Sequence, residues 1–179
     1  MSKNYFNASI LVIFLFLPSL SYAHSLHEMQ ISGFSGFFHP LQGFDHIVAM
    51  LAVGFWAAQL RGVAMWVLPL TFVGVMALGG LFGTLLGFEL DYAETIILLS
   101  GFVLSILAIK NVQFDLKVSA LIVGFFALFH GFAHGTEIAD SADLVSYSLG
   151  FICATSLLHL TGIGLAYSVN VMNLKFKKV

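Results

Sequence analysis

The sequence contains very little charge. Only 9% of its 179 residues are Asp, Glu, Lys or Arg, against about 25% in a typical soluble domain. Apolar residues make up 59% of the chain, and the mean hydropathy is +0.98. This composition excludes an ordinary soluble domain and predicts an integral membrane protein. The net charge of −2, without any basic run, gives no reason to expect a nucleic-acid partner.

Cysteine is nearly absent, since Cys153 is the only one. A disulfide framework and a cysteine-based metal cluster within one chain are therefore excluded. The sequence also lacks a nucleotide-binding P-loop and an HExxH zinc motif. Direct coupling to nucleotide hydrolysis within this chain is therefore not expected, and the absence of HExxH gives no support to a zinc hydrolase.

The N-terminus has the features of a secretory signal peptide. Lys3 supplies the positive charge, and the apolar run over 8–17 is too short to span a bilayer comfortably. Small residues then form a cleavage site that ends at Ala23. We expect a signal peptide over 1–23, followed by a single membrane domain over 24–179. An uncleaved first membrane helix is the alternative.

Five apolar stretches follow, each close to the length of about 17 to 25 residues that a membrane-spanning helix needs. They cover residues 41–60, 63–88, 93–109, 118–135 and 144–171. The connections are short, so neighbouring helices should be antiparallel. The predicted fold is all-α, a polytopic bundle of five transmembrane helices.

Beyond the predicted signal peptide, the basic residues all fall at one end of this predicted bundle. If the mature chain starts outside, all its basic residues fall in cytoplasmic segments: Arg61, Lys110, Lys117, Lys175, Lys177 and Lys178. The connecting loops on the other side hold acidic residues: Glu89, Asp91, Glu94, Glu137, Asp140 and Asp143. This partition follows the positive-inside rule. It predicts a multi-pass protein of the bacterial inner (cell) membrane, with the N-terminus outside and the C-terminus cytoplasmic.

The second predicted span carries Gly79, Gly83 and Gly87 at intervals of four. These residues share one helix face and allow another backbone to approach closely. We expect packing within the bundle, and the alternative is contact with another copy in a homo-oligomer.

Polar residues gather at the external end of the first span, in "HPLQGFDH". Pro40 suits the first helical position, which puts His39 just before the helix or at its cap. Asp45 and His46 are neighbours and point roughly 100° apart. Met50 lies one turn below His46 on the same face. Charged and strongly polar groups are costly in a membrane and usually face a bundle interior or a water-filled path.

The fourth span ends at the same outer level in "FHGFAHGTE". His130 and His134 are four residues apart, so one helix face can present both imidazoles to a metal ion. Glu137 continues this face, although it could instead be an ordinary solvated loop acid. Imidazole ligands suit nickel, copper, zinc and iron. The two clusters together therefore predict a transition-metal site.

The fifth span carries a deeper histidine in "ATSLLHLTG". His159 lies about fifteen residues from the outer end, or roughly 22 Å at 1.5 Å per residue. Thr155 is one turn above it on the same face. Together with Met50 of the first span, this pair is a candidate for a transport path, and a structural hydrogen bond between helices is the alternative for His159.

These motifs together resemble the HupE/UreJ family of small membrane permeases. The resemblance rests on "HPLQGFDH" with Met50, on "FHGFAHGTE" and on "GFICATSLLHLTG", and it extends over nearly the whole chain. It implies nickel transport, with cobalt second, and a link to a nickel-enzyme maturation system that supplies hydrogenase or urease. It also implies these metal residues: His39, Asp45, His46, His130, His134 and Glu137.

We therefore expect a permease that moves a divalent metal inward, with no catalytic cofactor. Zinc or copper is an alternative cargo, because affinity alone does not favour nickel. Two other functions fit the same residues. One is an intramembrane zinc-dependent hydrolase with Asp45 or Glu137 as general base. The other is an accessory protein that binds metal without transporting it.

Overall fold

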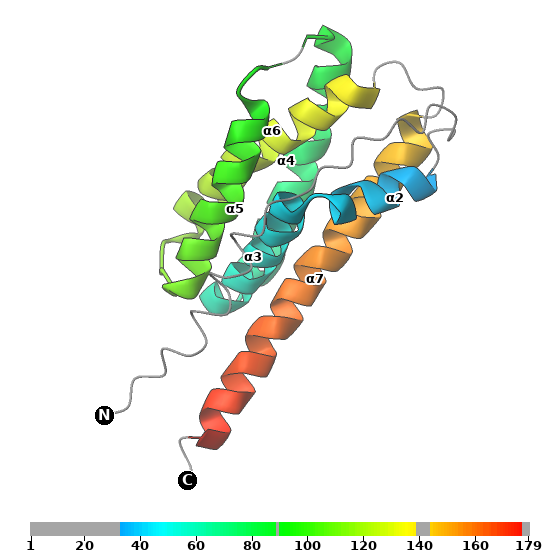
Figure 1. Cartoon of the computed structure of the whole chain (residues 1–179). Coiled ribbons are helices and arrows are strands. Elements are labelled where there is room, and N and C mark those ends of the chain that lie inside the picture. Colours follow the sequence, from blue (N-terminus) through cyan, green and yellow to red (C-terminus); the bar gives the residue numbers. More distant parts are fainter. Residues whose placement is uncertain (1–32, 89, 139–143, 177–179) are drawn as a thin grey trace.

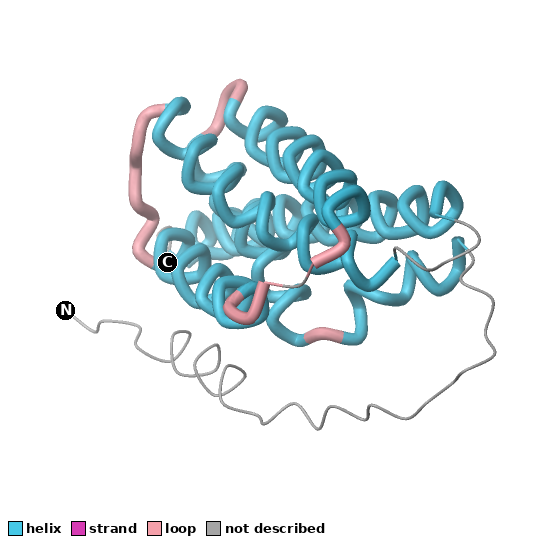
Figure 2. The backbone as a smooth tube through the Cα atoms, turned by 90° about the horizontal axis from the view of Figure 1, so that it is seen from above, coloured by secondary structure: helices cyan, strands magenta, loops and turns pink. Residues whose placement is uncertain are grey.

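The computed structural model describes residues 33–88, 90–138 and 144–176, with side chains up to Thr136 in α6 and up to Val169 in α7. The described chain consists of helices joined by short loops, as Figure 2 shows, and contains no strand. The helices are α2 (Gly33–Gln42), α3 (Phe44–Leu60), α4 (Ala64–Leu86), α5 (Ala93–Ile109), α6 (Leu116–Ile138) and α7 (Leu144–Phe176). The predicted all-α class is confirmed for these residues. The predicted signal peptide lies outside them.

Three of these helices are long and apolar enough to cross a membrane: α4, α6 and α7. The bent pair α2 and α3 meets the same criteria when it is counted as one span. The 17 residues of α5 are apolar but extend only about 26 Å, slightly less than a hydrocarbon core of about 30 Å. The five apolar stretches are thus helical as predicted, and length and composition identify three to four of them as spans.

The helices form a bundle in which α3 packs against α2, α4, α5 and α7. Figure 1 shows the α3–α4 and α5–α6 connections at one end of the bundle and the α4–α5 connection at the other. Large apolar side chains point outward from the bundle, including Leu85 at 70% exposure and Leu121 at 72%. Such an apolar exterior is what a lipid environment covers.

Two helices, and not one, carry the first polar motif. His39 and Pro40 lie inside α2, which meets α3 at an angle of 87°. The expectation that Pro40 begins the spanning helix is therefore wrong. Proline removes one helical hydrogen bond, α2 ends two residues later, and Gly43 breaks the helix in an extended conformation. Long-range packing holds α2 in place, because Gly36 allows its backbone to lie against Tyr147 of α7.

The glycines of α4 serve packing within the bundle, as predicted. A Cβ atom on Gly79 or Gly83 would collide with backbone atoms of Leu128 or Phe132 in α6. Gly87 has a different role: it ends α4 in the left-handed conformation, at φ 62°. The α4–α6 pair is the most extensive helix contact among the described residues, and it fixes the position of the histidines on α6.

Candidate metal site

Four histidines from three helices gather where α2 meets α3. His39 comes from α2, His46 from α3, and His130 and His134 from α6. The His134 ring centroid lies 4.6 Å from that of His39 and 4.8 Å from that of His46. The His46 and His130 centroids are 5.3 Å apart. Residues separated by almost a hundred positions thus form one imidazole cluster, as the sequence predicted.

Asp45 controls the orientation of His46. Its Oδ1 atom lies 2.9 Å from the Nδ1 atom of His46 and also accepts a hydrogen bond from the His46 backbone N–H. A carboxylate in this position accepts a hydrogen bond from Nδ1–H, which favours the tautomer with a free lone pair on Nε2. Metal-binding histidines commonly have such a carboxylate behind them. The geometry therefore allows Asp45 to act on a metal through His46.

The closest polar contact in the cluster joins the Nε2 atoms of His46 and His134, which are 2.7 Å apart. Two nitrogens at this distance share one proton, and with Asp45 accepting from His46, that proton belongs to His134. Two imidazoles that bind one ion at about 2.1 Å in a cis arrangement would be about 3.0 Å apart. A movement of a few tenths of an ångström and displacement of the proton would therefore admit a metal ion.

No three His, Cys, Asp or Glu side chains in the described ranges are arranged as a ready-made metal site. The hydrogen bond just described holds the Nε2 atoms of His46 and His134 slightly closer than two cis ligands of one ion would be. His39 and His130 flank this pair by ring contacts without completing a coordination shell. The arrangement is a cluster of available imidazoles, and coordination requires small movements of their rings.

A phenylalanine contacts both this cluster and the deeper histidine. The ring centroid of Phe72 lies 5.3 Å from that of His130 and 5.1 Å from that of His159. Phe72 and His159 are almost completely buried. No described residue forms a hydrogen bond with Nε2 of His130 or with either ring nitrogen of His159. An unsatisfied buried polar group costs about 1–3 kcal/mol, so these nitrogens are unusual for groups with only a structural role.

The other predicted residues are placed as follows. Thr155 is buried one turn from His159, and its hydroxyl has no hydrogen-bond partner among the described residues. Met50 is fully buried in the same apolar core as Phe72. Glu137 belongs to α6, but its side chain lies outside the described part of the structure.

The aromatic side chains around the histidines were not predicted from the sequence. Phe151 of α7 lies 5.0 Å from His134 and 5.7 Å from His39 between ring centroids, and Tyr147 lies 5.9 Å from His39. No local pattern distinguishes these residues or Phe72 from the many other aromatic residues of this chain. They are identified by the way α4 and α7 pack against the cluster.

Gly43 leaves the space in which Asp45 and His46 meet. A Cβ atom there would collide with Nδ1 of His46 and approach Oδ1 of Asp45 to 2.8 Å. We expect Gly43→Ala to lower metal affinity by about 10- to 100-fold, the range seen when groups that orient metal ligands are changed. Titration of purified protein with nickel measures this effect.

Gly74→Ala is the matched control, because a Cβ atom on Gly74 would meet nothing within 4 Å beyond the adjacent backbone of its own helix. It should bind nickel like the unmodified protein. Unchanged affinity in Gly43→Ala would show that the Asp45–His46 geometry does not matter for binding.

Comparison with known proteins gives a consistent result. The family model described as "HupE / UreJ protein" matches residues 12–178. "Protein HupE" of Rhizobium leguminosarum bv. viciae is 45% identical over 154 residues, which cover 85% of this chain and 78% of that protein. No solved structure matches the chain.

Proposed function

The chain belongs to the HupE/UreJ family, which is generally associated with nickel and cobalt transport, and we propose that it is a permease that carries a divalent metal inward. Nickel is the first candidate for the cargo and cobalt the second. The observation that carries this proposal is the cluster of four histidines, followed along the bundle by His159. The proposed recipient is a nickel-enzyme maturation system.

Capture takes place at the outer cluster. His46 and His134 provide the first two nitrogens, since their Nε2 atoms already face each other. His39 and His130 stand beside them as further ligands. Asp45 contributes its negative charge and holds His46 in the required orientation. Glu137, which follows His134 on the same helix, remains a proposed ligand from the sequence.

Passage continues from His130 towards His159 and Thr155. The ring nitrogens of these two histidines that lack hydrogen-bond partners among the described residues are available to a passing ion. A permease must bind its ion at successive sites weakly enough for it to leave each one. An inside-negative potential favours inward movement of a dication by about 4.6 kcal/mol per 100 mV, since each charge contributes about 2.3 kcal/mol.

Uptake into proteoliposomes tests the proposal. We expect accumulation of radioactive nickel in vesicles with an inside-negative potential, and competition by cobalt. Binding of nickel without flux would instead identify an accessory metal-binding protein. Turnover of a lipid or peptide that depends on zinc would identify an intramembrane hydrolase.

The proposed topology has five spans, with the N-terminus outside and the C-terminus cytoplasmic. In a Cys153→Ser background, Asp91→Cys should react with a membrane-impermeant thiol reagent added to intact cells. Lys110→Cys should react only after the membrane is opened, because the two residues lie at opposite ends of α5. Lys177→Cys should behave like Lys110→Cys. Reaction of either lysine position from outside would contradict the five-span arrangement.

A further inference from the structure

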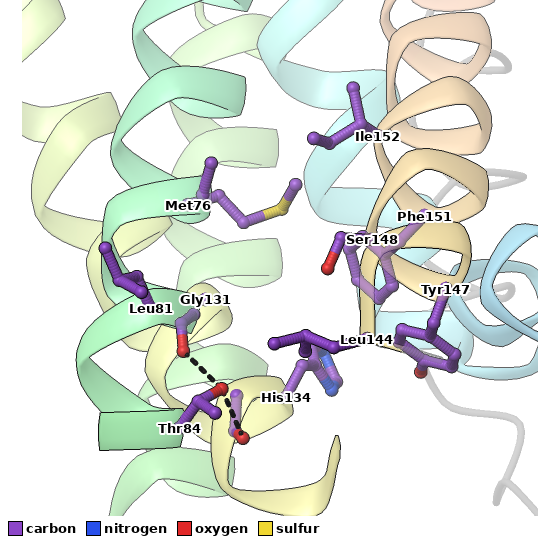
Figure 3. A pocket seen from close by; sticks show the side chains of 13 residues that line it. Met76, Leu81, Thr84, Gly131, His134, Leu144, Tyr147, Ser148, Phe151 and Ile152 are labelled. Atoms are coloured by element: carbon purple, nitrogen blue, oxygen red, sulfur yellow. Dashed lines mark hydrogen bonds between the residues drawn. The ribbon is translucent and has the colours of Figure 1, made fainter. Parts of the chain in front are cut away.

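A cleft of about 150 Å³ lies between the α4–α6 pair and the outer part of α7. It exists because the helices on its two sides are held by different contacts. Close glycine contacts join α4 to α6, whereas α7 packs mainly along α2 and α3 and touches α4 much less. Figure 3 shows the cleft between these helices, with Met76 and Leu81 on one side and Ser148 and Tyr147 on the other.

The cleft reaches the histidine cluster at one residue. Within the described part of the chain, His134 is the only one of the four clustered histidines that lines it. His134 is also the residue whose Nε2 atom contacts His46. An ion in the cleft would therefore meet the cluster first at the imidazole that has to exchange its proton for a metal.

The cleft is large enough for a partly hydrated cation, and its mostly apolar lining includes the polar side chains of Ser148, Tyr147 and His134. A cavity needs about 10–15 Å³ to hold one water molecule, so this volume holds several. The Ser148 hydroxyl points into the cleft (Figure 3) and offers an oxygen. The Thr84 hydroxyl already donates within the protein, since it lies 3.0 Å from the carbonyl oxygens of both Gly80 and Gly135. This contact joins α4 to α6.

We propose that this cleft is an aqueous vestibule through which a hydrated divalent cation reaches His134. The proposal rests on the permease function and topology proposed above, which put these ends of α4, α6 and α7 at the outer face. Ser148 lines the entry and exchanges hydration water with the ion, and His134 receives it.

Thiol labelling tests the vestibule in reconstituted protein with the Cys153→Ser background. Ser148→Cys puts a thiol in the cleft, and Leu149→Cys puts one on the neighbouring outward face, where Leu149 is 63% exposed. A cationic, membrane-impermeant methanethiosulfonate reacts with thiolates, which form in water and not in lipid. We therefore expect Ser148→Cys to react at least about ten-fold faster than Leu149→Cys. Nickel should slow this reaction, and labelled Ser148→Cys should lose most of the nickel uptake that it shows before labelling.

Three results would overturn the proposal. Equal labelling rates at the two positions would mean that the cleft contains no water. Full uptake after complete labelling of Ser148→Cys would mean that ions do not pass through it. Protection by nickel that persists after His134→Ala is added would mean that the thiol, and not the cluster, holds the ion.

The same experiment separates the vestibule from the permease function. Absence of uptake by the Cys153→Ser parent counts against the permease. In that case the labelling rate of Ser148→Cys still shows whether water enters the cleft. Slowing of this labelling by nickel still shows whether the metal reaches His134 through it.

Discussion

Changing His46 or His134 to alanine should each lower nickel affinity by at least about 100-fold, because even groups that only orient metal ligands cost about 10–100-fold when they are changed. The affinity of the double variant for nickel should be less than about ten-fold below that of either single variant, because residues that act on one ion are not independent. The structural reason is the 2.7 Å contact between their Nε2 atoms, which lets both side chains bind the same ion.

Titration of the purified single and double variants measures this coupling. Thr161→Ala is a suitable control, since Thr161 is exposed on α7 and its hydroxyl bonds within its own helix to Leu157. Losses that add fully in the double variant would mean that His46 and His134 belong to separate sites. The double variant His46→Ala with His130→Ala extends the test. Its loss of nickel-binding free energy should also be smaller than the sum of the losses in the two single variants.

The second large effect concerns His159. We expect His159→Ala to reduce the initial rate of nickel uptake by about ten-fold or more, because removing an intermediate site raises a barrier along a multi-site path. Equilibrium affinity at the outer cluster should change little, since His159 lies outside the group of four clustered histidines and shares with His130 a ring contact to Phe72. The measurement is uptake rate and binding affinity on the same preparation.

Ser156→Ala provides the comparison for this experiment. Ser156 lies on the same helix, three residues from His159, and its hydroxyl is bonded within the helix to Ile152. It should transport nickel normally. If His159→Ala also transports normally, the His159 side chain is not part of the transport path, and this position serves only the close backbone contact of α7 with Gly54 of α3.

Prediction from sequence was most successful where the signal is local. The HxxxH spacing on α6 put His130 and His134 on one face, and both belong to the cluster. Hydropathy located all five apolar helices, with α5 matching its predicted range. The same reasoning failed at Pro40, because a helix start was inferred from a local preference, whereas packing of α2 on α7 decided the outcome.

The sequence by itself determined that this chain is an all-helical membrane bundle with histidines and an aspartate at one end, because hydropathy and the 3.6-residue helical period act within each segment. Only the tertiary structure decided which imidazoles meet. It put His46 against His134, Phe72 in contact with both His130 and His159, and a cleft beside His134. The helical period fixes the faces of each helix, but the rotation, tilt and bend of one helix against another depend on contacts between distant residues. Here glycines of α4 and α6 and the break at Gly43 set those relations.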